Sequence, residues 1–260
     1  MLRDLINKVL FKTKNYLNVS ETWDKKWEKI DINKFRHQSF FTDKWTLYHK
    51  PLIEKYLKKV DKNSVFLEAG CGLGQWCFYV SKNYEIKSIG VDIAEKIIKR
   101  LNDYCNNENK LVSFRVDDLN NSKLDNNCCD MFVSLGVIEH FKDSMPMMKT
   151  LYSLIRPNGV GIITVPNIYC MQTFTRPILQ SIGKWGIGYE KSFSPKSLRK
   201  IALSVGFEVI ENGVLPCGEM FGSFLNSLPV IGKMFKKISY FIEERQNIIG
   251  FLSFVVVKKI

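Results

Sequence analysis

Two groups of residues in this sequence have types and spacings suited to binding a ligand and acting on it. The first begins with the run Glu68-Ala69-Gly70-Cys71-Gly72-Leu73-Gly74, which follows a short apolar segment and precedes a helical stretch. Glycines let the backbone turn sharply and let a ligand approach without a Cβ between them, and the helix that follows offers free N–H groups to an anion. Asp92 closes the next apolar segment, 24 residues after Glu68. An acid at that place suits the two hydroxyls of a ribose, so the pattern predicts a nucleoside-binding site.

The spacing of these glycines argues against a dinucleotide. Cys71-Gly72-Leu73-Gly74-Gln75 places a glycine one position earlier than the dinucleotide fingerprint does, which disfavours a nicotinamide-dependent reductase. A glycine loop without a ligand is disfavoured too, because the turn and the acid at the next strand end occur together in the expected order.

The second group is the pair Glu139-His140, which follows a later apolar segment. The ordinary pKa of histidine lies near neutrality, which suits a general base. The alternative is that this pair caps the next helix and only touches the edge of the ligand. Tyr48 and His49 are a weaker pair that fits helix packing better than catalysis.

The cysteines and histidines predict no metal site. Seven cysteines contain no CxxC pair, and the three histidines at 37, 49 and 140 are scattered, so the pattern is that of a reduced, cytoplasmic protein. The longest apolar stretch, residues 248–257, is half of the roughly 20 residues that a membrane-spanning helix needs. Residues 1–14 predict a basic amphipathic helix and not an export signal.

The elements that must position these residues alternate between apolar strands and helices. Strands are predicted at 64–68, 86–91, 111–116, 129–135, 160–165, 207–211 and 251–257. Helices are predicted from residue 75, over 145–155 with Pro157-Asn158-Gly159 ending it, and from the Ser194-Pro195 cap to Gly206. Apolar strands separated by helices predict a doubly wound, mostly parallel seven-stranded α/β sheet with helices on both faces.

The domain organisation follows from these elements. Residues 1–60 are predicted to form an N-terminal helical cap, and residues 61–211 the α/β core that binds the cofactor. Residues 212–250 would be an insertion that covers the substrate or faces a membrane, and residues 251–260 the last strand of the core sheet.

The net charge of +12 is concentrated at the two ends of the chain. Residues 1–60 carry 14 basic and 7 acidic side chains (+7), residues 61–170 carry 12 and 13 (−1), and residues 171–260 carry 12 and 6 (+6). Basic flanks suit an anionic small substrate, an anionic membrane surface or nucleic acid. A general enrichment of lysine on the protein surface explains the charge equally well.

Taken together, these motifs resemble the class I S-adenosylmethionine-dependent methyltransferase family, in its small-molecule branch with Glu-His after the fourth strand. The resemblance spans residues 62–211 and the last strand. The motifs that carry it are Glu-x-Gly-x-Gly-x-Gly from Glu68, Asp92, Asp117-Asp118-Leu119, the segment from Leu135 to His140, the 154–160 turn and Phe193-Ser194-Pro195. It implies the Rossmann-like methyltransferase fold, S-adenosylmethionine as cofactor and S-adenosylhomocysteine as product.

The resemblance also implies roles for the residues of the first group. The backbone of Gly70, Cys71 and Gly72, in the turn that Gly74 completes, would pack against the methionine part of the cofactor. Glu68 would lie near its ammonium group.

The later motifs would contact the rest of the cofactor. Asp92 would hold the ribose hydroxyls, and Ile93 would lie against the adenine. Asp118 would accept from the adenine amino group, with the adjacent Asp117 as a rival for that role and Leu119 packed nearby. Leu135 and Gly136 would line the floor beneath the sulfonium.

The chemistry implied is in-line methyl transfer to a small-molecule or lipid-linked acceptor, with oxygen as the favoured acceptor atom and His140 as the candidate base. An RNA methyltransferase and a non-catalytic S-adenosylmethionine-binding partner protein are the alternatives. Nucleic acid is disfavoured, because the Ser134–His140 segment lacks the Asp/Asn-Pro-Pro-aromatic run of enzymes that modify base amino groups. The cysteine nucleophile of cytosine-modifying enzymes is also missing from that region, since no cysteine follows Cys129 until Cys170. Apolar residues flanked by lysines at 1–14 and 228–237 suggest peripheral contact with the inner face of the membrane. The oligomeric state is not predicted.

Overall fold

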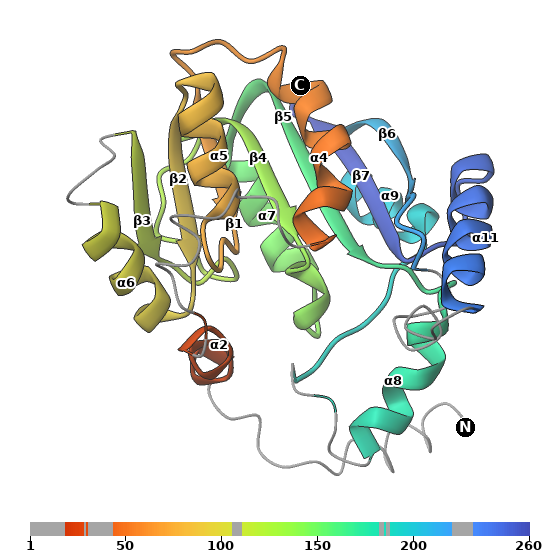
Figure 1. Cartoon of the computed structure of the whole chain (residues 1–260). Helices are drawn as coiled ribbons and strands as arrows, with labels where there is room; N and C mark the ends of the chain where they lie inside the picture. Colours follow the sequence, from red (N-terminus) through yellow and green to blue (C-terminus); the bar gives the residue numbers. More distant parts are fainter. Residues whose placement is uncertain are drawn as a thin grey trace.

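The computed structural model describes residues 19–28, 30, 44–105, 111–181, 185, 188–219 and 231–260. Within these ranges a seven-stranded sheet has the order β3-β2-β1-β4-β5-β7-β6 (Figure 1). Only β7 runs against its neighbours, pairing antiparallel with both β5 and β6. The strands are β1 (Val65–Ala69), β2 (Lys87–Asp92), β3 (Val112–Val116), β4 (Cys129–Leu135), β5 (Ile155–Pro166), β6 (Glu208–Leu215) and β7 (Leu252–Lys258). The predicted fold class is confirmed.

Helices cover both faces of this sheet. Figure 1 shows α4 and α5 in front of it and α7 and α9 behind it. The helices are α2 (Val19–Glu28), α4 (Lys44–Leu57), α5 (Gln75–Tyr84), α6 (Glu95–Cys105), α7 (Met145–Leu154), α8 (Met171–Ser181), α9 (Pro195–Ser204) and α11 (Ile231–Arg245), with a short 3₁₀ turn η1 (Ile138–His140). The helix predicted over residues 1–14 lies outside the described residues.

The core divides into layers because successive residues of a strand point to opposite faces. Phe66 and Met131 pack with α4 and α5, whereas their neighbours Leu67 and Phe132 pack with α7 and α9. All four side chains are fully buried. This is why the strands appear in the sequence as continuous apolar runs and not as alternating ones.

The predicted start of α9 is confirmed in detail. Ser194 has an extended backbone, and its Oγ accepts a hydrogen bond from the N–H of Ser197 at 3.1 Å. Pro195 occupies the first helical position, where its missing N–H costs nothing. The helix therefore begins where the sequence places it.

Two strands are longer than predicted. Residues 157–159, predicted as the turn that ends a helix, lie within β5, because Asn158 N–H donates to Lys259 O (2.7 Å) and Gly159 O accepts from Lys259 N–H (3.2 Å). β6 continues past 211 to Leu215, which pairs with Leu252 of β7 and is buried. In both places a partner segment distant in sequence extends the ladder, and local turn residues do not reveal such a partner.

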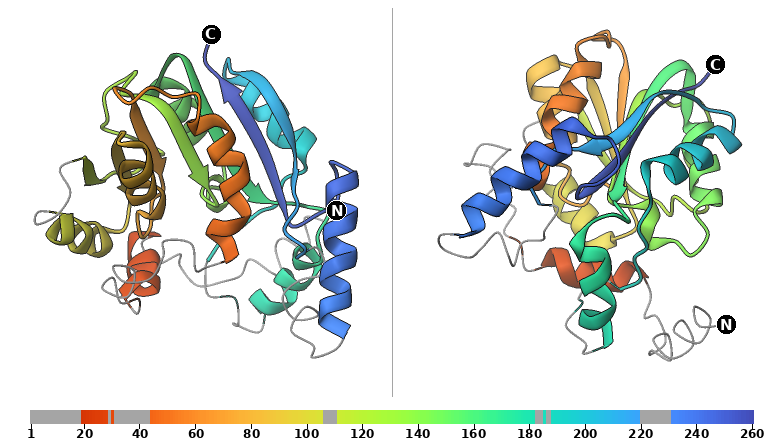
Figure 2. Two further views of the ribbon diagram at one scale, coloured as in Figure 1. Left: turned by 45° about the horizontal axis from the view of Figure 1, so that its top comes forward. Right: turned by 90° about the vertical axis from the view of Figure 1, so that its right-hand side faces the viewer.

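Helix α2 lies across the carboxyl ends of the parallel strands (Figures 1 and 2). Asp24 Oδ1 accepts from the N–H of Lys96 in the first turn of α6 (2.9 Å), and Ser20 Oγ donates to Ile93 O (2.9 Å). The sheet order reverses between β1 and β4, and open α/β sheets bind ligands at such a crevice. α2 therefore covers the place where a ligand is expected.

Candidate active site

A cavity of about 520 Å³ lies between α2 and the carboxyl ends of the strands. Its size is within the range of about 300–1,000 Å³ that is usual for small-molecule sites. The lining brings together twelve of the residues singled out from the sequence: Glu68, Gly70, Cys71, Gly72, Asp92, Ile93, Asp117, Asp118, Leu119, Leu135, Gly136 and His140. Gly74 is not among the lining residues; the position of a Cβ there is 2.4 Å from the Phe114 ring.

The glycine turn is shaped by positive φ angles at Gly70 (79°) and Gly72 (49°). A Cβ on Gly70 would stand 2.4 Å from Val137 Cγ2, so the turn excludes any larger residue there. The N–H groups of Gly70 and Cys71 both donate to Val91 O at 2.8 Å. These two N–H groups are therefore used within the fold and are not free to bind a ligand. Because Gly70 and Gly72 have no Cβ, a ligand can still approach the backbone of the turn closely.

Glu68 is the last residue but one of β1, and it caps the helix that follows. Its Oε2 accepts a hydrogen bond from the N–H of Cys77 at 3.0 Å, and no side chain caps α5 at Gly74. The first-turn N–H groups of a helix need such an acceptor. Burial raises the pKa of Glu68 to about 8, in spite of the hydrogen bond, which lowers it. The carboxyl group would therefore be stabilised as an anion by a nearby cation.

Asp92 is held by two backbone donors at the end of β2. Its Oδ2 accepts from Gly72 N–H (2.8 Å) and its Oδ1 from Ala94 N–H (3.0 Å). Burial raises the pKa of Asp92, while these hydrogen bonds oppose the rise. Each carboxylate oxygen still has a lone pair for an additional donor, such as a hydroxyl.

The two adjacent acids after β3 differ in environment. Asp118 is exposed and its Oδ1 accepts from the N–H of Asn120 at 2.9 Å. Asp117 is buried; its Oδ2 accepts from Lys123 N–H at 3.0 Å, and its Oδ1 is buried without a hydrogen-bond partner. A buried acceptor without a donor is costly, so Asp117 is the better placed of the two to accept from a ligand.

Two more acidic residues, Glu139 and Glu190, line the end of the cavity near His140. Glu139 is 2% exposed, and its Oε2 has no hydrogen-bond partner. Glu190 lines the same wall and forms a buried ion pair with Arg176 (2.7 Å). Burial raises the pKa of Glu139 well above its usual range; the negative charge of Glu190 adds to the rise, and the positive charges of Arg176 and Lys26 oppose it. This end of the cavity therefore favours a ligand that brings a positive charge or a hydrogen-bond donor.

His140 is held as a neutral imidazole. Its Nδ1 lies 2.7 Å from Tyr189 O, and a carbonyl can only accept, so Nδ1 carries the proton and Nε2 the lone pair. Burial lowers the pKa of His140 to about 4. Trp23 of α2 packs edge-on against the ring, with the centroids 5.0 Å apart.

Several lining residues were not identified from the sequence as site residues. Trp23, Lys26 and Trp27 come from α2, and Gln172 and Glu190 from or near α8. The sequence does show that Trp23 and Trp27 are four residues apart. On a helix this spacing places them on one face, but it does not show that the face lines a ligand site. His49 is fully buried, with Nδ1 2.7 Å from Trp45 O and Nε2 2.8 Å from Thr164 Oγ1, so it serves packing.

The charge balance of the cavity indicates its ligand. Among the described lining residues six are carboxylic acids and one, Lys26, is a lysine. Such a surface suits a cationic ligand with hydroxyl and amino donors better than a phosphate. S-adenosylmethionine carries a sulfonium, an ammonium, a ribose and an adenine, so the donor and acceptor groups present fit it.

Comparison with known proteins agrees with this chemistry. Residues 67–163 match the family model described as a methyltransferase domain. This segment is therefore similar to methyltransferase domains. The match agrees with the predicted family and with its cofactor, whereas the roles of individual residues stay predictions.

The relatives of this methyltransferase domain include small-molecule enzymes. The chain is 27% identical over 108 residues to phosphoethanolamine N-methyltransferase of Plasmodium falciparum, covering 41% of this chain and 40% of the relative. It is 29% identical over 106 residues to ajmaline N-methyltransferase of Rauvolfia serpentina, covering 40% and 36%. The chain therefore matches less than half of the length of these curated relatives.

A solved structure shows the same fold. Phosphoethanolamine N-methyltransferase 2 of Haemonchus contortus, in complex with phosphomonomethylethanolamine and S-adenosylhomocysteine, superposes with a TM-score of 0.65 at 18% identity. The match covers 94% of this chain and 60% of that one. The similarity of fold thus extends beyond residues 67–163.

Proposed function

We propose that this protein transfers a methyl group from S-adenosylmethionine to a small-molecule acceptor, and that the acceptor atom is an amine nitrogen. The observation that carries the proposal is the buried, unpartnered Oε2 of Glu139 at the acidic far end of the cavity. The names of the relatives, which are N-methyltransferases, support it. They do not support the oxygen acceptor predicted from the sequence.

The strand ends would hold the cofactor. Asp92 would accept from the ribose hydroxyls with the lone pairs left free by its two backbone donors, and Asp117 Oδ1 would accept from the adenine amino group. Glu68 would lie beside the ammonium, which would lower the pKa of its carboxyl group. When bound, S-adenosylmethionine supplies a methyl group that its sulfonium has already activated.

Glu139 and Glu190 would bind and orient the acceptor. Glu139 Oε2 would receive a hydrogen bond from the amine, while Arg176 holds Glu190 in place through the 2.7 Å ion pair. An amine enters as an ammonium and must lose a proton before its nitrogen can attack. Holding the two reactants in the right orientation lowers the barrier to such a displacement.

His140 would take part through its neutral ring. The Nδ1–H donates to Tyr189 O, so Nε2 presents a lone pair that can accept the proton of the amine. A pKa of about 4 makes it a weak base. His140 would therefore hold the proton only transiently, and it would act within the pair Glu139-His140 and not as a strong base alone.

A matched pair of acceptors tests this proposal. Purified protein is incubated with methyl-labelled S-adenosylmethionine and with either phosphoethanolamine or glycerol phosphate, which present an amine and a hydroxyl beside the same anionic group. We expect label on the amine and not on the alcohol. Label on the alcohol would overturn the nitrogen assignment. Binding of S-adenosylhomocysteine without transfer to these or to bulkier amines would overturn the proposed acceptor class.

A further inference from the structure

Exposed apolar side chains gather on two helices outside the candidate active site. Of the eighteen large hydrophobic residues that are exposed in the described part of the chain, five lie between 168 and 178 and seven between 231 and 249. Phe174 is 70% exposed, Ile178 63% and Phe241 53%. Scattered single apolar residues are ordinary, but a contiguous group of this size marks an interaction surface.

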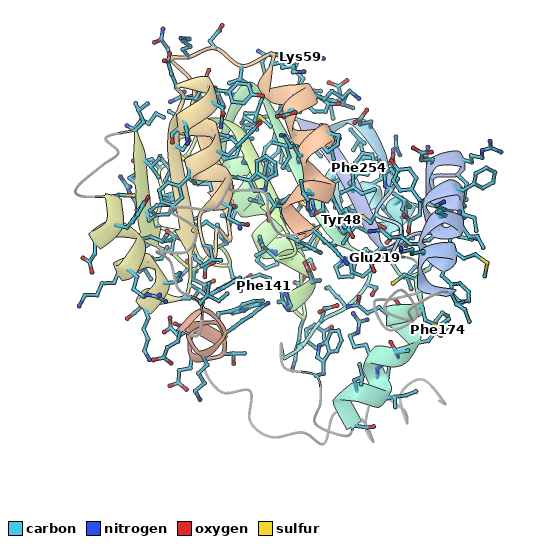
Figure 3. The ribbon with its side chains drawn as sticks, in the orientation of Figure 1. Tyr48, Lys59, Phe141, Phe174, Glu219 and Phe254 are labelled. Atoms are coloured by element: carbon cyan, nitrogen blue, oxygen red, sulfur yellow. The ribbon has the colours of Figure 1, made fainter. Side chains whose placement is uncertain are left out.

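Helical spacing places these side chains in one stripe on each helix. On α8 the stripe consists of Met171, Phe174 and Ile178, and Arg176 is buried in its ion pair with Glu190. Figure 3 shows Phe174 on α8 below the end of α11. The outer side of α8 is thus apolar while its inner side serves the cavity.

Helix α11 has the same organisation. Its exposed stripe is Ile231, Met234, Ile238 and Phe241, at positions i, i+3, i+7 and i+10. Ser239 and Glu243 lie on the buried side, where Glu243 Oε2 accepts from the N–H groups of Cys217 and Gly218 at 2.6 Å each. The polar residues of α11 therefore anchor it, and the apolar stripe faces outward.

The segments that adjoin the two helices are hydrogen-bonded to each other. Asn167, just before α8, donates from Nδ2 to Ile248 O (2.7 Å) in the segment after α11, and its N–H donates to Phe251 O (2.9 Å). In Figure 1 both helices lie toward the side of the sheet that carries β6 and β7, and the right view of Figure 2 shows α11 to one side of the sheet and α8 below it. We call the exposed stripes of the two helices the α8–α11 face.

The charge of this face indicates what kind of partner it binds. From residue 231 to 242, α11 carries the exposed lysines Lys233, Lys236 and Lys237 and no acidic residue, in a chain of net charge +12. An apolar stripe bordered by lysines is the pattern of helices that lie in the interface of anionic membranes. A second copy of the chain would bring these lysines together, and nucleic acid would leave the apolar stripes uncovered.

We propose that the α8–α11 face binds the surface of an anionic phospholipid bilayer. No helix in the described ranges is long and apolar enough to cross a bilayer, so binding would be at the interface. Residues 1–14 and 228–230, which suggested membrane contact from the sequence, lie outside the described residues. The proposal rests on α8 and α11 alone and is independent of the methyl-transfer proposal.

The position of the face has a consequence for the acceptor. Gln172 of α8 lines the cavity, as do Glu190, which Arg176 holds, and Phe251, which follows α11. One helix therefore separates the cavity from the proposed lipid surface. An acceptor that resides at the membrane interface would reach the cavity past α8.

Cosedimentation with vesicles tests the proposal. Wild-type protein is mixed at low salt with vesicles of equal parts phosphatidylcholine and phosphatidylglycerol, or with vesicles of phosphatidylcholine alone. We expect sedimentation with the anionic vesicles only. The double variant Phe174→Ser/Phe241→Ser and the double variant Lys233→Glu/Lys237→Glu are each expected to bind at least about tenfold more weakly.

Matched variants on α9, behind the sheet, provide the control. Leu203 is an exposed apolar residue, and Lys196 and Lys200 are exposed lysines. Leu203→Ser and Lys196→Glu/Lys200→Glu are expected to bind anionic vesicles as the wild type does, and S-adenosylhomocysteine affinity reports that every variant is folded. Absence of wild-type binding to anionic vesicles would overturn the proposal. So would equal losses in the α9 controls, or a wild-type dimer that the α8–α11 variants convert to monomers.

Discussion

The two walls of the cavity differ in what holds their residues in place. The strand-end wall consists of residues 68–72, 92–93 and 117–119, each directly at or after the end of a parallel strand. The helical wall consists of Trp23, Lys26 and Trp27 of α2, Gln172 of α8, and Glu190. Backbone hydrogen bonds fix the first wall, whereas packing of side chains from distant segments forms the second.

Their acidic groups show the difference clearly. Asp92 accepts from two backbone N–H groups and Glu68 from one, so the fold itself holds these carboxyl groups. On the opposite side Glu190 is held by a side chain, that of Arg176, and nearby Glu139 leaves Oε2 without a partner. A backbone-held wall suits a ligand common to a whole family. A wall held by side chains can change its ligand with few substitutions.

The largest expected effect is at the backbone of the strand-end wall. In Gly70→Ala the Cβ would lie 2.4 Å from Val137 Cγ2 at a φ of 79°. We expect the affinity for S-adenosylhomocysteine, measured by calorimetry, to fall by about 100-fold or more, with a loss of about 2 kcal/mol in the free energy of unfolding.

Gly188→Ala is a matched control for the effect of positive φ alone. Gly188 has a φ of 71°, but within the described part of the chain no atom outside its own chain neighbours lies within 4 Å of the Cβ position. It should lose about 1 kcal/mol of stability from the backbone conformation and keep its affinity for S-adenosylhomocysteine. Equal losses of affinity in the two variants would show that the strand-end wall is not specially constrained.

The second prediction concerns Glu139, which lies near Glu190 of the helical wall and which we expect to bind the acceptor and not the cofactor. Glu139→Gln removes the ability of the buried side chain to become a carboxylate when a cationic acceptor binds, and it preserves the shape of the side chain. We expect kcat/KM for an amine acceptor to fall by about 10- to 100-fold, because a charged hydrogen bond is lost, while the affinity for S-adenosylhomocysteine stays near that of the wild type. Glu95→Gln, at an exposed position at the start of α6, is the control. A parallel loss of S-adenosylhomocysteine affinity would assign Glu139 to the cofactor side instead.

The difference between the walls also determines how much could be predicted from the sequence. The strand ends carry short motifs, and the topology of an α/β sheet brings those ends to one edge, so most of the strand-end residues and the sheet itself were identified from residue spacing and family resemblance. Glu190 and Lys26 were not. Their place beside Glu139 depends on where residues 188–190 and α2 pack, and no local pattern encodes this. The lengths of β5 and β6 escaped prediction for the same reason, since partners far along the chain determine them.

The third prediction distinguishes the two adjacent acids of the strand-end wall. Asparagine keeps only one acceptor oxygen, so in Asp117→Asn either Lys123 N–H or the ligand loses its partner. We expect about a tenfold loss of S-adenosylhomocysteine affinity. Asp118→Asn, at the exposed neighbouring position, should change it little. The reverse order would restore Asp118 to the role that the family resemblance suggested.

The smallest effect concerns a proton at Glu68. Its pKa of about 8 in the unliganded cavity lies above the ordinary value of 4.5, so the carboxyl group is mostly protonated at neutral pH. A ligand ammonium beside it would favour the carboxylate, and binding would release close to one proton. Affinity for S-adenosylhomocysteine should therefore rise several-fold per pH unit between about pH 6 and pH 8. Calorimetry in buffers of different ionisation enthalpy measures the released proton directly.

The variant Glu68→Gln lacks the carboxyl group that would release this proton. It should also change how the stability of the free protein depends on pH. Because the folded-state pKa is raised, the folded protein binds more protons than the unfolded chain between pH 4.5 and about 8. The free energy of unfolding of the wild type should thus fall, relative to Glu68→Gln, as the pH rises through this window. Binding by the variant should release no proton and show a flat pH profile. If wild type and variant share one profile, the ammonium does not lie beside Glu68, and the strand-end wall holds the cofactor in another orientation.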